Sequence, residues 1–418
     1  MSGPDVVGWG GEEPAGPRPP RRSGWPERVR HASAAARRRR WSGLAGTVLV
    51  GLAAAVLAFR AGADPEAPPP PQPTRTFDLG SPVQFVSEVA FGPATAYALV
   101  GACVGPEETR SCRYRVLQRA LTRPGWTVTA VRTGAVAGAA GLPRLFVAGD
   151  RLTVVDQPTV GNVLTSPDGG RTMTVQGLSA APPVPAVLRG DIVDLGLCES
   201  CLDRLTVLEP RTGRLRPLAT QPPLGPSVGV RAFADSAGAL WALGDSGTGL
   251  VSSVSLDGGR TWRTLPLRGG GPGAAEATAL APDGRRGAWL LVSRDADPHT
   301  TNEFSELWRV GDPTRPGAGW QLVTPARRPR SVDGLLVSAG TALIQDEAGQ
   351  LLRLEPGGVL RALPPIQVDG VPRGPDVVVA GPGRLLLAIA NRPEGTGPPR
   401  VLLSRDGGRS WQLEELPP

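Results

Sequence analysis

The 418-residue sequence contains no lysine, two histidines, two tyrosines and four cysteines. So few histidines argue against a histidine-rich metal hydrolase. No glycine-rich loop opens a predicted helix, so the common phosphate-binding motifs are absent. No long stretch follows a helical hydrophobic period, which favours an all-β fold. Because every basic side chain apart from histidine is arginine, a single arginine carries little weight here as a functional signal.

One short string occurs three times in the sequence. Each copy reads Ser-x-Asp-Gly-Gly-Arg, followed by Ser or Thr and then by Trp or Met. The copies are Ser166–Met173, Ser255–Trp262 and Ser404–Trp411. Asp can accept hydrogen bonds from nearby backbone N–H groups, and Gly adopts positive φ without a steric clash. Since apolar runs flank the copies, each predicts a tight turn between two β-strands.

The string resembles the Asp-box, or BNR repeat, of sialidases, sortilin-type receptor ectodomains and photosystem assembly factors of the same architecture. The resemblance implies a β-propeller in which the box joins the third and fourth strands of a blade, away from the ligand face. It also implies a structural role for the box rather than metal binding or catalysis. The residues to which this role is assigned are Ser166, Asp168, Gly170, Ser255, Asp257, Gly259, Trp262, Ser404, Asp406, Gly408 and Trp411.

The spacing of the copies predicts the number of blades. Asp168 and Asp257 are 89 residues apart, and Asp257 and Asp406 are 149 residues apart. At about 45–50 residues per four-stranded blade, these distances correspond to two and three blade steps. Short apolar runs from about residue 81 onward divide into seven units, although the third unit shows three strands only. We therefore expect an all-β, seven-bladed propeller over residues 81–418, with six or eight blades as alternatives and residues 75–79 as an extra closing strand.

The N-terminal part of the chain predicts a membrane anchor. Residues 1–40 are rich in Gly, Pro and Arg, which is typical of a disordered basic tail. Residues 41–60 include an uncharged apolar run long enough to span a bilayer. Arginines before this run place the N-terminus in the cytoplasm and the propeller outside, and residues 61–80 form a proline-rich linker. A cleaved signal peptide ending near Ala61-Gly62-Ala63 is the alternative.

The four cysteines form two local pairs after the apolar run. In an extracytoplasmic domain, Cys103–Cys112 and Cys198–Cys201 are expected to be disulfides. A redox centre is less suited to Cys198 and Cys201 because they lie in a predicted hairpin rather than at a helix N-terminus. A zinc site would need two further ligands.

The leading functional hypothesis is an extracytoplasmic membrane-anchored propeller that binds or assembles a protein or glycan, without catalysis and without a cofactor, metal or nucleic acid. The alternative is a glycoside hydrolase of the exo-sialidase type, or another hydrolase that uses the propeller funnel. The resemblance would then require a Tyr nucleophile paired with Glu, but neither Tyr97 nor Tyr114 has such a context. His299 lies in a polar loop that we expect to be solvated rather than metal-bound.

Overall fold

The computed structural model describes most of the chain from Val83 to Pro417. The described residues are 83–105, 111–134, 136–137, 142–156, 161–193, 204–224, 231–234, 238–245, 250–267, 275–283, 286–294, 306–323, 332–346, 348–368, 370–372, 374–391 and 398–417. The predicted tail, membrane segment, linker and closing strand at residues 75–79 lie outside them. Within the described part, no helix has the length and hydrophobicity needed to cross a bilayer.

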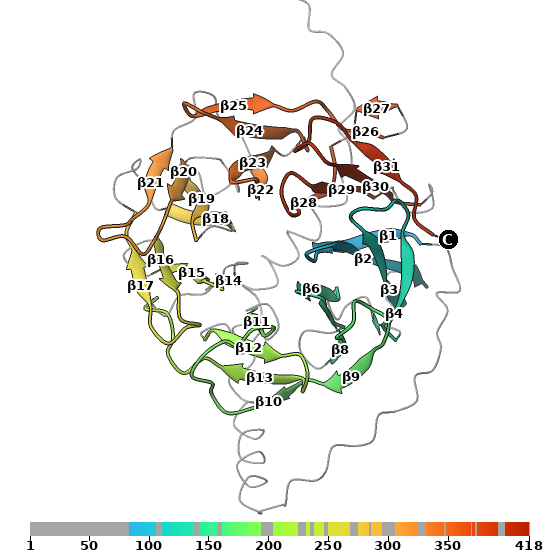
Figure 1. The fold of residues 1–418 in the computed structure, drawn as a ribbon, viewed down its shortest axis with the longest axis horizontal. Helices are drawn as coiled ribbons and strands as arrows, with labels where there is room; N and C mark the ends of the chain where they lie inside the picture. The colour runs from blue at the N-terminus through green and yellow to red at the C-terminus, as the bar shows by residue number, and fades with distance from the viewer. Residues whose placement is uncertain are drawn as a thin grey trace, which may run out of the picture. The chain divides into compact units, whose positions relative to one another are not determined.

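The described residues form seven four-stranded antiparallel blades around a central axis, one of them with a parallel outer strand (Figure 1). Blade 1 is β1 (Phe85–Phe91), β2 (Thr95–Val104), β3 (Ser111–Ala120) and β4 (Thr127–Arg132), with β5 (Val136–Ala137) added to β3; blade 2 is β6 (Arg144–Ala148), β7 (Arg151–Val155), β8 (Asn162–Ser166) and β9 (Thr174–Gly177). Blade 3 is β11 (Ile192–Val193), β12 (Thr206–Glu209), β13 (Arg214–Pro217) and β10 (Ser179–Ala180); blade 4 is β14 (Arg231–Ala234), β15 (Leu240–Asp245), β16 (Leu250–Ser255) and β17 (Arg263–Leu265).

The remaining three blades complete the ring, which confirms seven blades over the six or eight that the sequence also allowed. Blade 5 is β18 (Ala275–Pro282), β19 (Ala288–Arg294), β20 (Glu306–Val310) and β21 (Gln321–Val323); blade 6 is β22 (Val332–Ser338), β23 (Thr341–Asp346), β24 (Leu351–Glu355) and β25 (Val359–Ala362); blade 7 is β28 (Val377–Ala380), β29 (Leu386–Ala390), β30 (Arg400–Ser404) and β31 (Gln412–Glu414). A small hairpin of β26 (Gln367–Val368) and β27 (Val371–Pro372) lies between blades 6 and 7 in sequence.

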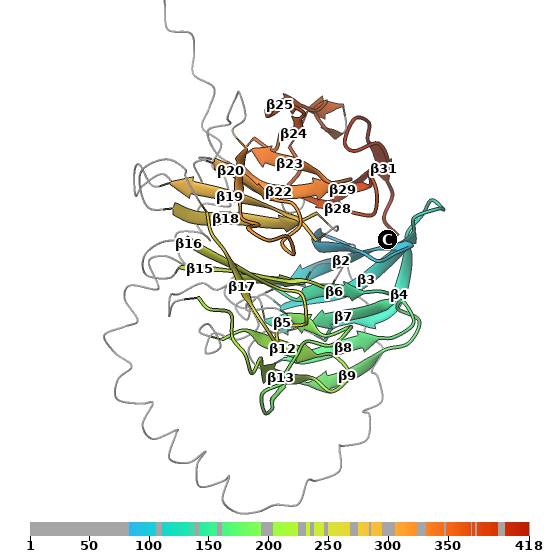
Figure 2. The same cartoon turned by 60° about the vertical axis from the view of Figure 1, so that its left-hand side comes forward.

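The apolar core lies between the blades rather than at the centre of the ring. The buried side chains of the described residues form seven clusters, and each cluster joins two neighbouring blades. Figure 2 shows the successive sheets stacked face to face. Each sheet therefore buries both faces, which explains why the second and third strands read as nearly continuous apolar runs such as Leu386–Ala390.

Blade 3 takes its outermost strand from the segment that precedes it. β10 follows blade 2 in sequence and pairs in parallel with β13 at the outer edge. The sequence prediction found only three strands in this unit. It missed β10 because that strand has two residues, both exposed, and so lacks an alternating apolar pattern.

The ring closes between blades 7 and 1 without exchange of a strand among the described residues. Instead, side chains join the two blades. The guanidinium of Arg119 donates from Nε to Glu414 Oε2 over 2.7 Å and from a terminal nitrogen to Oε1 over 2.8 Å. The Asn391 side chain accepts from Val86 N and donates to Val86 O. These bonds surround the apolar cluster that Leu117, Leu387 and their neighbours form at the same junction.

Candidate functional site

The three repeated strings, named here the repeat turns, join the third and fourth strands of blades 2, 4 and 7. The predicted spacing of two and three blade steps is therefore confirmed. In each turn a buried serine hydroxyl donates to the Asp carboxylate and accepts from the N–H of the second Gly. In blade 4, Ser255 Oγ lies 2.7 Å from Asp257 Oδ1 and 2.7 Å from Gly259 N.

The Asp carboxylate then holds the end of the turn. Asp257 Oδ1 accepts from the backbone N–H of Thr261 over 3.0 Å, and Oδ2 accepts from the Thr261 hydroxyl over 2.6 Å. Asp168 and Asp406 make the same pair of bonds to Thr172 and Ser410. Both oxygens of each carboxylate are therefore engaged by the turn itself, and the chemistry of the three groups is hydrogen-bond acceptance rather than proton transfer to a ligand.

These hydrogen bonds lower the pKa of all three carboxyl groups from 3.8 to about 2. At Asp168 the largest cause is the backbone N–H of Thr172, and at Asp257 it is the hydroxyl of Thr261. At Asp406 burial raises the pKa, but the bonds from Ser410 and Ser404 outweigh it. The shift follows from donors that favour the charged form, and each carboxylate is ionised at neutral pH.

The second glycine of each repeat turn packs against the preceding blade. A Cβ atom on Gly259 would lie 2.3 Å from Leu218 of blade 3, and one on Gly408 would lie 2.8 Å from Leu363 of blade 6. In blade 2, Gly170 meets Thr129 of blade 1 in the same way, and its carbonyl accepts from Ala130 N. Each of these glycines also has positive φ. The repeat turns therefore fasten one blade to the blade before it.

The last residue of each repeat turn packs in the same direction. Met173, Trp262 and Trp411 are partly buried against the clusters that join blades 1 and 2, 3 and 4, and 6 and 7. The Trp262 indole also donates to the carbonyl of Thr220 in blade 3 over 3.0 Å. This residue therefore extends the apolar layer between the two blades.

The two tyrosines lie in the apolar cluster between blades 1 and 2. Tyr97 is 3% exposed and Tyr114 is 2% exposed. Burial raises the pKa of both phenols above the ordinary value of 10.0. The Tyr97 hydroxyl is hydrogen-bonded to Thr95. Both phenols are buried and protonated, so neither side chain is placed to attack a dissolved substrate.

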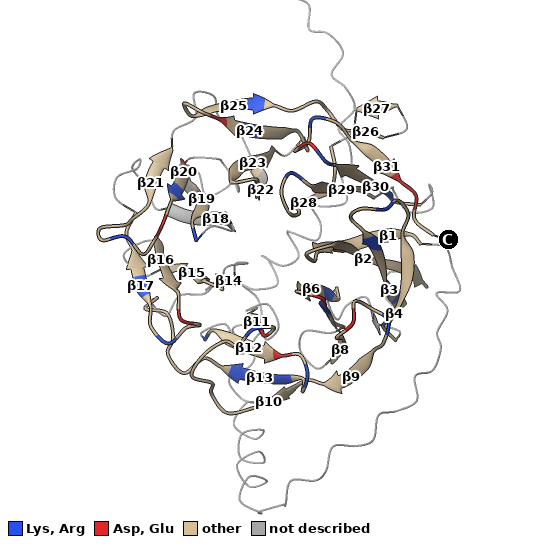
Figure 3. Cartoon of the chain, in the orientation of Figure 1, with Lys and Arg blue, Asp and Glu red and all other residues tan. Residues whose placement is uncertain are grey.

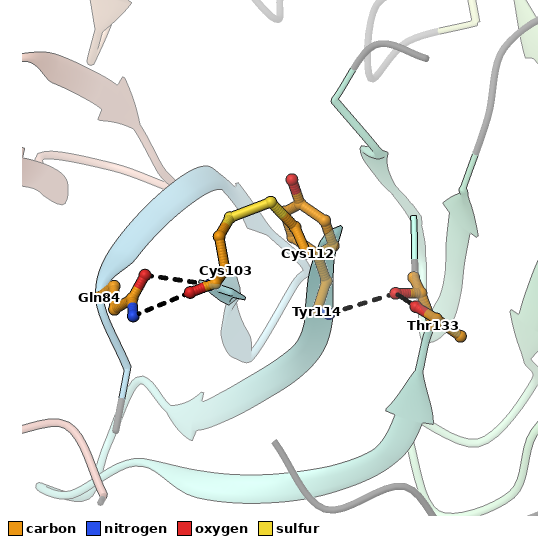
Figure 4. The surroundings of a disulfide bond; sticks show 6 residues. Gln84, Cys103, Cys112, Tyr114 and Thr133 are labelled. Carbon is orange, nitrogen blue, oxygen red and sulfur yellow. Dashed lines mark hydrogen bonds between the residues drawn. A yellow bond between two sulfur atoms is a disulfide. The ribbon is translucent and has the colours of Figure 1, made fainter. Parts of the chain in front are cut away.

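The predicted Cys103–Cys112 disulfide is confirmed, and it closes the hairpin of β2 and β3 (Figure 4). The two cysteines are directly opposite each other in the strand register. The Gln84 side chain bonds to both the N–H and the carbonyl of Cys103, and β5 pairs with Ser111 and Cys112. These contacts support both edges of the hairpin. Its two strands have ten residues each and are the longest strands in the described part of the chain.

Polar side chains also join the innermost strands of blades 1 and 2. Glu88 of β1 accepts from Leu145 N and from Arg144 Nε, both in β6. The Arg144 guanidinium also lies over the Phe146 ring at 5.8 Å. The sequence reading did not identify this link, because Glu88 and Arg144 are 56 residues apart and only the ring brings them together.

A second repeated hairpin was also missed. Blades 3 and 6 contain Leu-x-x-Leu-Glu-Pro, which starts at Leu205 and at Leu351. A glutamine closes each hairpin: Gln221 donates to the carbonyls of Leu205 and Leu218, and Gln350 donates to those of Leu351 and Leu363. The repetition of Leu-x-x-Leu-Glu-Pro at a distance of about three blades was the signal that could have found it.

Several predicted site residues lie outside the described residues. Cys198, Cys201 and His299 are among them, so the second disulfide and the solvated histidine loop stay predictions. Among the residues that the structure does describe, no group of three or more His, Cys, Asp or Glu side chains is arranged to hold a metal ion.

No protein-family model matches the chain, and no curated protein sequence matches it. Similar solved structures include YCF48 bound to D1 peptide, at 13% identity and a TM-score of 0.32, covering 80% of this chain and 82% of that one. The α-L-arabinanase of Penicillium chrysogenum with arabinobiose is 12% identical with a TM-score of 0.36, covering 73% and 92%. The uncomplexed acylaminoacyl peptidase of Pyrococcus horikoshii is 9% identical with a TM-score of 0.46, and this chain spans about half its length, covering 80% and 53%. These similarities do not discriminate between binding and catalysis.

Proposed function

We propose that the chain is an extracytoplasmic, membrane-anchored propeller that binds or assembles a protein or glycan and catalyses no reaction. Residues 1–40 form its cytoplasmic tail, residues 41–60 its membrane helix, residues 61–80 its linker and residues 81–418 its propeller. The three repeat turns are Asp-boxes in this proposal, with a structural role. The observation that carries it is the burial of Tyr97 and Tyr114, the two tyrosines in the chain.

The tyrosines matter because an exo-sialidase-like reaction needs a phenol that can reach the anomeric carbon of a sugar. Both phenols are buried between blades 1 and 2, where apolar side chains pack against the rings and the Tyr97 hydroxyl is hydrogen-bonded to Thr95. The carboxylates of the repeat turns do not replace them, since hydroxyl and N–H donors occupy both oxygens. A hydrolase that uses other carboxylates in the propeller funnel is the second candidate.

The test uses the full-length protein in native membranes. A C-terminal affinity tag, a cleavable carboxylate-reactive cross-linker added from outside and mass spectrometry should recover a specific extracytoplasmic protein; the cross-linker targets carboxylates because the chain has no lysine. A glycan array probed with the detergent-solubilised chain tests the sugar alternative. The same preparation is assayed with fluorogenic sialosides, arabinosides and peptides. Saturable turnover of any of these substrates would refute the non-catalytic proposal. Turnover that Tyr97→Phe abolishes would contradict the burial argument, and turnover that Tyr97→Phe leaves unchanged would favour the hydrolase that uses other carboxylates.

The anchoring is tested separately by extraction and proteolysis. The full-length protein should stay with membranes after washing with alkaline carbonate and should dissolve in detergent. Protease added outside spheroplasts should cleave the linker and release the propeller. Recovery of the mature chain in the medium, beginning near Asp64, would instead support the cleaved signal peptide.

A further inference from the structure

Four exposed arginines lie together at the edge of the ring where blades 7 and 1 meet. Arg384 is in the turn between β28 and β29, and Arg405 and Arg409 are in the repeat turn of blade 7. Arg384 O accepts from Gly407 N, which joins these two turns. Arg405 donates to the carbonyl of Leu121, two residues before Arg123 in the turn between β3 and β4 of blade 1. We name Arg123, Arg384, Arg405 and Arg409 the seam patch.

The charge of the seam patch is not balanced by neighbouring carboxylates. The one acidic residue in its three turns is Asp406, against four arginines. Both oxygens of Asp406 are already bonded to Ser404, Arg409 N and Ser410. None of the four arginines forms an ion pair with another described residue. Figure 3 shows basic positions in the connections of blade 7 beside blade 1.

From this charge and geometry we infer that the seam patch docks the propeller onto an anionic lipid surface. Guanidinium groups bind phosphate oxygens with two parallel donors, and juxtamembrane clusters of arginine are attracted to acidic leaflets. The four side chains are exposed and come from three neighbouring turns, so they can contact several phosphates of a bilayer at once. Of the anionic partners that such a cluster could bind, a bilayer is favoured because the proposed membrane anchor keeps one close to the propeller.

This inference rests on the proposed membrane anchoring, because the linker would hold the propeller within reach of the bilayer. Docking would then be an equilibrium between a raised and a lowered propeller. Since each arginine near an anionic surface contributes about a fivefold gain in affinity, three charge reversals should abolish docking.

The experiment reconstitutes the full-length protein in vesicles of phosphatidylcholine alone and of phosphatidylcholine mixed with phosphatidylglycerol. A donor fluorophore at the C-terminus, which leaves the ring beside blade 1 (Figure 1), reports energy transfer to acceptor lipids. The test variant is Arg123→Glu with Arg384→Glu and Arg409→Glu. The matched control reverses three other exposed arginines, Arg211→Glu, Arg214→Glu and Arg361→Glu, in blades 3 and 6.

We expect energy transfer to rise severalfold on phosphatidylglycerol vesicles, to fall in high salt, and to be lost in the test variant but kept in the control. The inference would be overturned if energy transfer were equal on the two vesicle types, or if the test and control variants lost energy transfer equally. It would also be overturned if the seam patch bound an acidic protein while its binding to vesicles did not depend on lipid charge. Carbonate extraction of the same vesicles separates the two proposals. If alkaline carbonate removes the protein from the vesicles but the protein still binds acidic vesicles in low salt, the proposed membrane anchor is refuted and the inference about the seam patch is supported.

Discussion

The buried ion pair between Arg119 and Glu414 should be the most sensitive point of ring closure. The two side chains are 2% and 4% exposed, and they join strands 295 residues apart in sequence. Glu414→Gln keeps the shape of the side chain but leaves the guanidinium buried without its counter-charge. Loss of one partner of a buried pair costs about 3–5 kcal/mol, which is a large part of the stability of a typical domain.

A matched control is present in the same chain. Arg353 and Glu355 form an ion pair of similar contact distance, but their side chains are 21% and 29% exposed. Glu355→Gln should therefore cost at most about 1 kcal/mol. The double variant Arg119→Met with Glu414→Met removes both charges and should recover most of the lost stability, because a buried pair pays a desolvation penalty that apolar side chains avoid.

The assay is urea denaturation followed by circular dichroism, with hydrogen exchange as a local readout. Glu414→Gln should lower the urea midpoint and raise exchange first in β3 and β31, the strands that carry the pair. If Glu414→Gln and Glu355→Gln lower the midpoint equally, the pair does not hold the ring closed. If exchange rises evenly in all seven blades, the effect is global rather than a failure of the seam.

Three further predictions concern the repeat turns and the disulfide. Gly259→Ala should lower the unfolding free energy by more than about 2 kcal/mol, because its Cβ would lie 2.3 Å from Leu218. Gly125→Ala has a similar φ but open space around it, and should lower the unfolding free energy by about 1 kcal/mol. Similar urea midpoints for the two variants would refute the packing argument. The pKa of Asp257 is lowered from 3.8 to about 2, so the stability that its carboxylate adds is present above pH 4 and is lost as pH falls towards 2. Asp257→Ala should therefore lose about 1–3 kcal/mol of unfolding free energy at pH 7 and should flatten the pH dependence of the urea midpoint between pH 4 and 2. Ligand affinity per folded molecule should not change. Non-reducing mass spectrometry should find the Cys103–Cys112 and Cys198–Cys201 linkages, and bound zinc would contradict the second; Cys103→Ser with Cys112→Ser should cost about 2–3 kcal/mol.

Much of the fold follows from the sequence because its signals are local. Each of the three repeat turns is specified by eight consecutive residues, which start at Ser166, Ser255 and Ser404. Their spacing predicted the correct number of blades. The apolar runs also divided residues 81–418 into seven units, which is the number of blades in the structure. Local signals of this kind do not depend on which distant segments meet.

The features that the sequence did not predict are those that depend on distant segments. β10 becomes a strand only because β13 is beside it. In the sequence, nothing distinguishes Glu414 from the other acidic residues near the C-terminus. In the closed ring, its carboxylate lies 2.7 Å from the guanidinium of Arg119. The link between Glu88 and Arg144 has the same origin. The candidate site was harder still, since an exposed arginine such as Arg384 gains meaning only from its position beside Arg405 and Arg409.

The two kinds of repeated hairpin meet at the same junctions between blades. Blades 2, 4 and 7 join their third and fourth strands with a turn that contains an ionised Asp and a Gly that touches the preceding blade. In blades 3 and 6, Gln221 and Gln350 bridge two carbonyls at the open end of a hairpin, away from its turn. At the same end, Leu218 and Leu363 contact the glycine of the next blade.

The two hairpins are therefore complementary parts of the same junctions, 3 with 4 and 6 with 7. The two polar repeats determine how neighbouring blades pack together. Their carboxylate and amide groups are already hydrogen-bonded within these hairpins and turns. Charged groups that remain available for a partner must be sought elsewhere. The seam patch between blades 7 and 1 meets that condition because its four arginines are exposed and lie beside a carboxylate that is already engaged, and only Arg405 among them is bonded to a backbone carbonyl across the seam.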